Sequence, residues 1–150
     1  MDKKIKSIIF VCLGNICRSP LAEGIAKKYI EEKALDINIQ SAGTGDWHIE
    51  EAPCEHSIKV ALNHGINIAE QKAKQVTQND LKKFDLVVGL DRKNISSLKH
   101  LGRKDVLLLG DFGFDGGDVP DPYFFDGFEG FDKVYEMIEI CVKNLMDEKC

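Results

Sequence analysis

The sequence predicts an α/β fold in which a four-stranded parallel sheet is covered by helices. The first observation is a continuous apolar run over residues 7–13, rich in branched side chains, which is typical of a strand buried on both faces. The second is the alternation of such runs with segments of helical periodicity, which favours a parallel sheet with right-handed crossovers. The third is the lack of a low-complexity linker or solenoid repeat, so we expect residues 1–150 to form one domain.

Each predicted strand is a short apolar run that ends at a turn residue. Gly14 ends the first run, and glycines at positions 43 and 45 follow the second. The third run comes just before Asp91, a residue type that favours a helix N-cap. The predicted strands cover residues 7–13, 37–42, 86–90 and 106–109.

The helices are predicted from apolar residues at helical spacing and from their end signals. Pro20 stands where the first turn of a helix tolerates proline, and His64-Gly65 ends a later segment. The predicted helices cover residues 20–33, 53–63, 78–84, 92–100 and 131–146. Residues 110–130 form the longest irregular segment, and loops of that length in a compact domain are usually functional or mobile.

Composition and charge narrow the range of partners. The formal net charge is −5, which argues against nucleic acid or an anionic membrane, because both need a basic face. The apolar run near the N-terminus is too short for a signal sequence or a transmembrane helix, so we expect a cytoplasmic protein. The five cysteines are unevenly spaced and do not pair with the histidines at zinc-ligand spacing. The cysteines are therefore better explained by a reactive thiol than by a disulfide framework or a zinc site.

The segment from Cys12 to Arg18 joins the first predicted strand to the first helix and has the composition of an anion-binding loop. Ligands in open α/β sheets bind at the carboxyl ends of strands, and a helix N-terminus there presents N–H groups to an anion. Gly14 and Asn15 tolerate the left-handed conformations that a tight loop needs. The guanidinium of Arg18 binds two phosphoryl oxygens at once. Helix N-terminus and cation together favour Cys12 as a thiolate, and Ser19 is placed to donate a hydrogen bond to it. The alternative is a buried structural cysteine beside a surface arginine.

Residues Cys12 to Pro20 resemble the signature of the low-molecular-weight protein tyrosine phosphatases, and Val119 to Tyr123 resemble the general-acid loop of that family. Residues 41–47 and 73–77 are also similar, so the resemblance covers nearly the whole chain. It implies a single-domain three-layer sandwich of the phosphotyrosine phosphatase I type, with flavodoxin-like winding of its four parallel strands. It also implies that no metal or cofactor takes part.

The resemblance implies a role for each site residue. Cys12 is the nucleophile, Arg18 binds the phosphoryl group, and Asp121, fixed between two prolines, is the general acid and then the general base. Asn15, Ser41 and Gln71 would hold the loop in shape, although Gln71 stands where the family often has histidine. The remaining residues of the phosphate-binding loop are Leu13, Gly14, Ile16, Cys17 and Ser19. The walls of the substrate slot are expected to be Leu13, Trp47, Tyr123 and Phe124.

The expected reaction is hydrolysis of phosphotyrosine in a protein, or of a small phosphate monoester, with inorganic phosphate as product. One rival is an arsenate reductase of the same fold, but that chemistry needs two further cysteines after the third strand, and residues 86–100 contain none. A second rival is a non-catalytic phosphate-binding module, which has no use for a reactive thiol and a fixed acid together.

Two further features extend the hypothesis. Cys17 lies five residues from Cys12, which suggests a reversible Cys12–Cys17 disulfide that protects the nucleophile from peroxide. The phenylalanine- and glycine-rich residues 124–131 are expected to border the site and to influence the choice of substrate.

Overall fold

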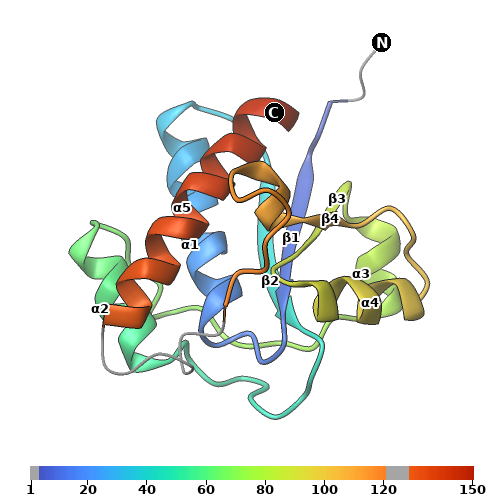
Figure 1. The fold of residues 1–150 in the computed structure, drawn as a ribbon, viewed down its shortest axis with the longest axis horizontal. Coiled ribbons are helices and arrows are strands. Elements are labelled where there is room, and N and C mark those ends of the chain that lie inside the picture. The colour runs from blue at the N-terminus through green and yellow to red at the C-terminus, as the bar shows by residue number, and fades with distance from the viewer. Residues whose placement is uncertain (1–3, 121–128) are drawn as a thin grey trace.

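The computed structural model describes residues 4–120 and 129–150 (Figure 1). Its four strands form one parallel sheet in the order β2-β1-β3-β4, which confirms the predicted fold class and winding. The strands are β1 (Ser7–Cys12), β2 (Asn38–Gly43), β3 (Leu86–Gly89) and β4 (Leu107–Leu108). The helices are α1 (Arg18–Glu32), α2 (Glu55–Asn63), α3 (Gln78–Lys83), α4 (Arg92–His100), the 3₁₀ helix η1 (Leu109–Phe112) and α5 (Glu129–Lys149).

Strand β1 lies in the middle of the sheet and is covered on both faces. Ile8, Phe10 and Cys12 face the larger core, which α1, α2 and α5 complete. Ile9 and Val11 face the smaller core beside α3 and α4. The residues named on β1 are at most 2% exposed, which explains why the strand is continuously apolar rather than alternating. The two helical layers lie on opposite sides of the sheet in Figure 1.

The strand order places the end of β1 at a topological switch point. The chain leaves β1 through α1 to reach β2 on one side, and β3 pairs with β1 on the other side. The segments that follow β1 and β3 therefore diverge and leave a crevice at the carboxyl edge of the sheet. Cys12 ends β1, and Asp91 follows β3, so both lie at this crevice.

The fourth strand is shorter than predicted. Leu107 and Leu108 pair with β3, but Leu109 begins η1 and is fully buried. The chain must turn here, because the carbonyl of Gly110 accepts hydrogen bonds from the N–H groups of Phe114 and Gly116. A Cβ atom on Gly110 would lie 1.7 Å from the carbonyl oxygen of Gly117, so the turn requires glycine. The apolar run indicated a strand because it carries no signal for this local turn.

Four helices begin or end away from their predicted bounds. Helix α2 begins at Glu55 rather than at residue 53, and α3 ends at Lys83 rather than at residue 84. Helix α1 begins at Arg18, two residues before the predicted start, and Pro20 lies in its first turn, where the N–H groups have no helical partner. Helix α5 runs from Glu129 to Lys149, beyond the predicted 131–146, and at its C-terminal end the added residues 147–149 are polar, so the apolar periodicity gave no signal for them.

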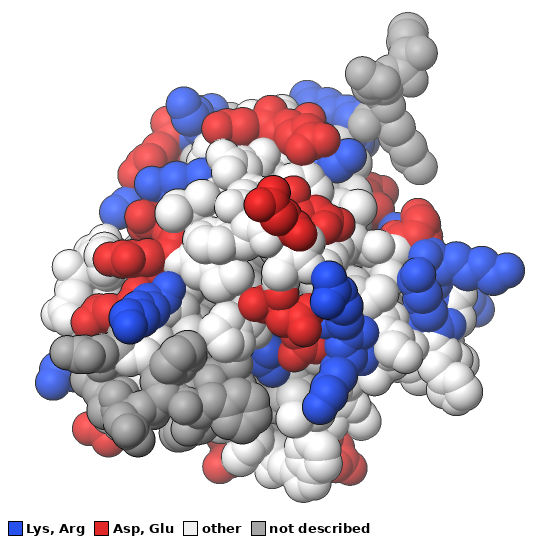
Figure 2. Space-filling view, viewed as in Figure 1, with Lys and Arg blue, Asp and Glu red and all other residues white. Residues whose placement is uncertain are grey.

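Charged side chains of both signs are interspersed over the face seen in Figure 2. This distribution agrees with the modest net charge of −5. Within residues 4–120 and 129–150, none of the helices combines the length and the apolar character needed to cross a membrane.

Candidate active site

The loop between β1 and α1 is held from outside through its carbonyl groups. The carbonyl oxygens of Cys12 and Leu13 accept hydrogen bonds from the N–H groups of Thr44 and Gly45, both at 2.9 Å. The carbonyl of Ile16 accepts from the N–H of Cys54 at 2.7 Å. The carbonyl of Cys17 accepts from the hydroxyl of Ser57 at 3.0 Å. In a trans peptide the N–H of the next residue points away from the carbonyl. The N–H groups of residues 13, 14, 17 and 18 therefore point to the inner side of the loop, where they form an anion cradle.

Asn15 shapes this loop. It has a φ of 56°, in the left-handed region that asparagine tolerates better than most residues. Its side chain is buried, and its amide nitrogen donates to the hydroxyls of Ser19 at 2.8 Å and Ser41 at 3.0 Å. Its amide oxygen accepts from the N–H of Lys74 at 3.0 Å. These three bonds hold a backbone conformation that is otherwise unfavourable.

The sulfur of Cys12 lies inside the loop, and Cys12 as a whole residue is only 2% exposed. The backbone N–H of Asn15 donates to this sulfur at 3.3 Å, and the hydroxyl of Ser19 lies 3.0 Å from it. The oxygen of Ser19 accepts from Asn15, and its single hydrogen has two acceptors in reach, the sulfur at 3.0 Å and the carbonyl of Ala42 at 3.5 Å. The closer sulfur, which needs a donor when it is negatively charged, is the favoured acceptor. Both donors stabilise a negatively charged sulfur.

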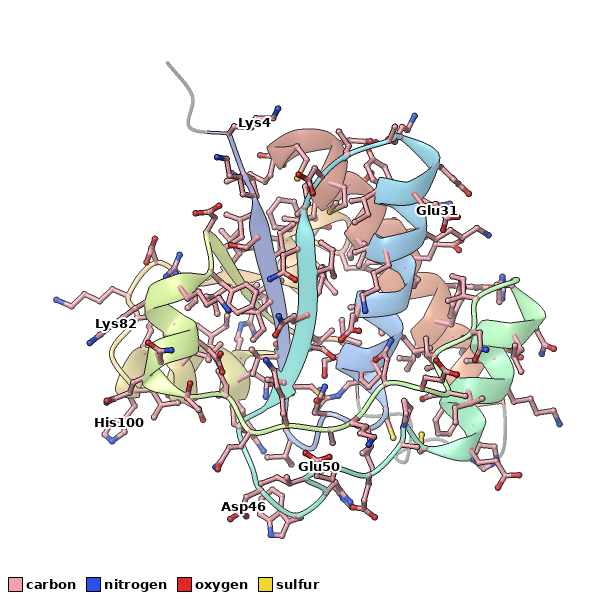
Figure 3. All side chains as sticks on the ribbon, turned by 180° about the vertical axis from the view of Figure 1, so that it is seen from behind. Lys4, Glu31, Asp46, Glu50, Lys82 and His100 are labelled. Carbon is pink, nitrogen blue, oxygen red and sulfur yellow. The ribbon has the colours of Figure 1, made fainter. Side chains whose placement is uncertain are left out.

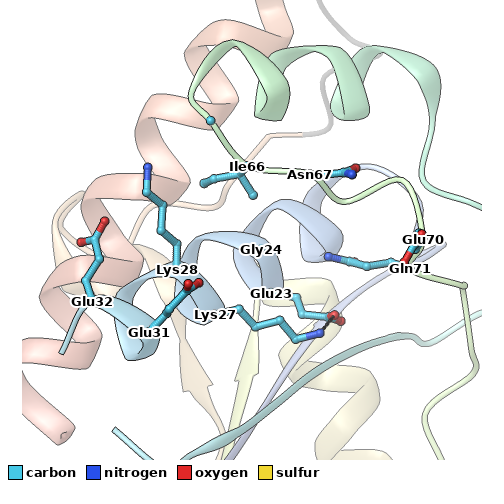
Figure 4. A pocket seen from close by; sticks show the side chains of 11 residues that line it. Glu23, Gly24, Lys27, Lys28, Glu31, Glu32, Ile66, Asn67, Glu70 and Gln71 are labelled. Carbon is cyan, nitrogen blue, oxygen red and sulfur yellow. Dashed lines mark hydrogen bonds and ion pairs between the residues drawn. The ribbon is translucent and has the colours of Figure 1, made fainter. Parts of the chain in front are cut away.

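A buried carboxylate ends the hydrogen-bond chain that starts at the sulfur. Ser41 donates to Glu23 at 2.6 Å, and Glu23 also pairs with Lys27 at 2.7 Å (Figure 4). The carboxylate fixes the direction of every bond in the chain, because it can only accept. Ser41 must then accept from Asn15, and Asn15 must donate to Ser19. Glu23 therefore helps to orient the Ser19 hydroxyl toward Cys12.

Arg18 connects the loop to two other segments at the crevice. Its guanidinium nitrogen Nη1 donates to the carboxylate of Asp91 at 2.7 Å and to the carbonyl of Val119 at 3.0 Å. The Arg18 side chain is 6% exposed and that of Asp91 is 16% exposed, so the ion pair is largely removed from water. The same Asp91 caps α4, since its carboxylate accepts from the N–H of Asn94 at 2.8 Å. The predicted capping role is confirmed, and the contact with Arg18 adds a second role.

A hollow of about 160 Å³ opens above Cys12 and Arg18. Leu13 and Trp47 stand at its mouth and are 47% and 67% exposed, so Trp47 belongs to a surface loop rather than to the core. That loop continues past Asp46 and Glu50, which Figure 3 shows beyond the carboxyl ends of the strands. The hollow therefore has a polar floor, and its walls include the apolar side chains of Leu13 and Trp47 beside the imidazole of His48.

A larger hollow of about 790 Å³ lies elsewhere, between α1 and residues 65–71 (Figure 4). It is lined mainly by charged side chains and contains neither Cys12 nor Arg18. Its Gln71 donates to the carbonyl of Pro20 at 3.2 Å. Within the described part of the chain, the amide oxygen of Gln71 is buried without a hydrogen-bond partner. The observed side-chain contacts of Asn15 thus involve Ser19, Ser41 and the backbone of Lys74, while Gln71 contacts the first turn of α1.

The structure gathers half of the predicted site residues around the hollow of about 160 Å³. It is lined by the described loop residues Cys12, Leu13, Gly14, Ile16, Cys17 and Arg18, together with Trp47 and His48. Asp121, Tyr123 and Phe124, and most of the segment 124–131, lie outside the described residues.

Sequence reasoning missed Glu23 and the second role of Asp91. Glu23 lies four residues after Ser19 and therefore on the same face of α1, which is a usable signal once Ser19 has been selected. Asp91 follows the strand that neighbours β1, but that neighbourhood is known only from the sheet order.

Comparison with known proteins agrees with this geometry. Residues 7–149 match the family model described as low molecular weight phosphotyrosine protein phosphatase. The chain belongs to this family. It is therefore a protein-tyrosine phosphatase by class, which the names of its curated relatives support.

Relatives from distant organisms match over most of the chain. The low molecular weight protein-tyrosine-phosphatase YfkJ of Bacillus subtilis is 41% identical over 131 residues, which cover 82% of this chain and 84% of YfkJ. The low molecular weight phosphotyrosine protein phosphatase 1 of Drosophila melanogaster is 32% identical and covers 97% of both chains. The crystal structure of YfkJ superposes with a TM-score of 0.88, covering 99% of this chain and 96% of that one.

Proposed function

We propose that this phosphatase hydrolyses phosphotyrosine in two steps through a phosphocysteine on Cys12. The observation that carries the proposal is the sulfur of Cys12, enclosed by a loop whose N–H groups point inward and bound by Ser19 and Asn15. A dianionic phosphoryl group in this cradle receives hydrogen bonds from the loop and from Arg18. Its phosphorus then lies in line with the sulfur.

In the first step the sulfur of Cys12 attacks phosphorus, and the bond from phosphorus to the tyrosyl oxygen breaks. Asp121 gives its proton to that oxygen, so the leaving group departs as neutral tyrosine. In the second step Asp121 takes a proton from water while the water oxygen attacks phosphorus. The sulfur–phosphorus bond breaks, and the hydroxyl of Ser19 stabilises the departing thiolate. Inorganic phosphate is the product.

The path of the chain supports the role of Asp121. Arg18 binds the carbonyl of Val119, and the N–H of Val119 donates to the carbonyl of Leu90 at 2.9 Å. Pro120 and Arg18 line the same hollow of about 390 Å³. The described chain therefore reaches the phosphate loop at Pro120, the residue that precedes Asp121 in the sequence.

The depth of the site favours an aryl phosphate over an alkyl one. Cys12 lies at the floor of the hollow, while Leu13 and Trp47 stand exposed at its mouth. A tyrosyl ring can pack against the apolar side chains of Leu13 and Trp47, whereas a phosphoserine side chain carries no ring to make this contact. A phosphotyrosine-containing protein is therefore the favoured substrate, and a small aryl phosphate fits the same slot. Because the thiol must stay reduced, we also propose a cytoplasmic location.

The test compares leaving groups in the same assay. Wild-type enzyme should hydrolyse a phosphotyrosine peptide at least about 100-fold faster than the matching phosphoserine peptide, with Cys12→Ser as the inactive baseline.

Asp121→Asn should lower kcat/KM on phosphotyrosine by about 100-fold or more, because general acid catalysis contributes about 10²–10⁴ in rate. The loss on p-nitrophenyl phosphate should be much smaller, since nitrophenolate leaves without a proton. Equal losses on both substrates would contradict the role of Asp121, and turnover by Cys12→Ser would contradict the whole mechanism.

A further inference from the structure

Two cysteines that lie far apart in the sequence meet at the wall of the active site. The sulfurs of Cys17 and Cys54 are 2.8 Å apart, although 37 residues separate them along the chain. Cys17 is the last residue of the phosphate loop before α1, and Cys54 is the residue before α2. Cys17 is buried and lines the hollow above Cys12, while Cys54 is partly exposed.

The backbone on both sides of this contact is fixed by hydrogen bonds. The N–H of Cys54 donates to the carbonyl of Ile16 at 2.7 Å, and the hydroxyl of Ser57 donates to the carbonyl of Cys17 at 3.0 Å. The sulfur of Cys54 also lies 3.1 Å from the hydroxyl of Ser57. A disulfide bond measures about 2.05 Å, so the two sulfurs need to approach by roughly 0.8 Å. Because the backbone on both sides is held by hydrogen bonds, we expect side-chain rotation to supply this approach.

We propose that Cys17 and Cys54 form a reversible disulfide when the protein meets a hydroperoxide, and that this bond keeps Cys12 reduced. In the direct route the more accessible sulfur of Cys54 attacks the peroxide oxygen and becomes a sulfenic acid, releasing one water or alcohol. The sulfur of Cys17 then attacks that sulfur and expels water. Two thiols are oxidised by two electrons, and one hydroperoxide is reduced.

A second route leads to the same product when Cys12 is oxidised first. Cys17, five residues away in the same loop, forms a Cys12–Cys17 disulfide with it, and Cys54 then attacks the sulfur of Cys17. The Cys17–Cys54 bond forms, the Cys12–Cys17 bond breaks, and Cys12 leaves as a thiolate with no net change in oxidation. The hydrogen bonds from Ser19 and from the N–H of Asn15 make Cys12 the better leaving group.

This inference changes the expectation drawn from the sequence alone. The proximity of Cys12 and Cys17 along the chain suggested that the reversible protective disulfide would join these two residues. The structure instead places the sulfur of Cys17 in contact with Cys54. The formation of the bond is independent of the proposed function, whereas its protective effect rests on Cys12 being the nucleophile.

Peptide mapping separates the two possible bonds. Trypsin places Cys12 and Cys17 together in the peptide 7–18 and Cys54 in the peptide 34–59. After mild treatment with hydrogen peroxide and alkylation of the remaining thiols, we expect these two peptides to be linked, with the alkyl group on Cys12. A bond closed within the peptide 7–18, alkylation at Cys17 in the linked pair, or no linked pair would overturn the proposal.

Two variants complete the test. Cys54→Ser removes the thiol at the N-cap of α2, where Cys54 makes no side-chain capping bond and serine is a favourable residue, so activity should stay within about two-fold of wild type. The variant should lose the linked pair. Cys150→Ser removes the exposed terminal thiol and should keep the pair. Under peroxide the wild type should retain most of its activity, while Cys54→Ser should lose activity at least about five-fold faster. Equal inactivation rates with the linked pair present would refute the protective role while leaving the bond itself established. Inactivity of all proteins before oxidation would count against the proposed function instead.

Discussion

At the scale of single residues, the site is a chain of hydrogen bonds whose directions are fixed by charge. A thiolate at Cys12 can only accept at one end, and the carboxylate of Glu23 can only accept at the other. Ser19, Asn15 and Ser41 lie between them and supply the hydrogens. Because all are largely buried, an unpaired group in this chain costs about 1–3 kcal/mol, which explains why loop shape and thiolate stability depend on each other.

Asp91 gives a prediction at this scale. Asp91→Asn keeps an oxygen that can cap α4 but removes the charge that pairs with Arg18. A largely buried guanidinium without its partner should lower the free energy of unfolding by about 3 kcal/mol in the absence of ligand. Phosphate then supplies the missing negative charge, so it should raise the Tm of the variant by more than it raises the Tm of wild type. Thermal unfolding with and without phosphate measures both effects, and an equal phosphate-induced rise would contradict the pairing argument.

At the scale of elements, the site depends on how closely the end of β2 approaches the phosphate loop. Gly43 pairs with Cys12 across the sheet. A Cβ atom on Gly43 would lie 2.7 Å from the carbonyl oxygen of Leu13 and 3.1 Å from the backbone nitrogen of Asn15. The loop can therefore close over the strand end because the residue there has no side chain.

Gly43→Ala should displace the loop without unfolding the protein. Overpacking of this kind costs about 1–3 kcal/mol, and the contact is with backbone that cannot rotate away. We expect kcat/KM on a phosphotyrosine peptide to fall by at least about ten-fold, while the far-ultraviolet circular dichroism stays that of the wild type. The result that would count against a close approach is unchanged activity in a folded variant.

At the scale of the whole molecule, α1 and α5 pack against each other in one helical layer, and α1 begins directly after the phosphate loop. Their contact includes a hydrogen bond of 2.5 Å from the hydroxyl of Tyr29 to the carboxylate of Asp147. This bond and the negative charge of Asp147 raise the pKa of Tyr29 to about 12. Burial raises the pKa of the Cys141 thiol in the same layer to about 11, so this thiol stays protonated at neutral pH.

The raised pKa of Tyr29 predicts how stability depends on pH. A group whose pKa is higher in the folded protein stabilises it below the unfolded value near 10 and loses that effect as pH rises toward 12. Tyr29→Phe should therefore be less stable than wild type at pH 8, and the difference should vanish between pH 10 and 12. Urea unfolding across this range measures the two curves. A constant difference at all pH values would show that Tyr29 contributes through packing alone.

The sequence by itself determined the class of fold and the chemistry of the phosphate loop. The apolar run before Cys12, the residues Gly14 and Asn15, and the arginine at the helix start are local features, and each acts through the backbone beside it. Residues far apart in the chain were decided by the tertiary structure, because their contacts follow from the order of the strands. The pairing of Arg18 with Asp91 needs β3 to lie beside β1, and the link from Asn15 to Glu23 needs Ser41 at the end of β2. The meeting of Cys17 with Cys54 follows instead from helix packing, since the contact of α1 with α2 brings the two helix starts together.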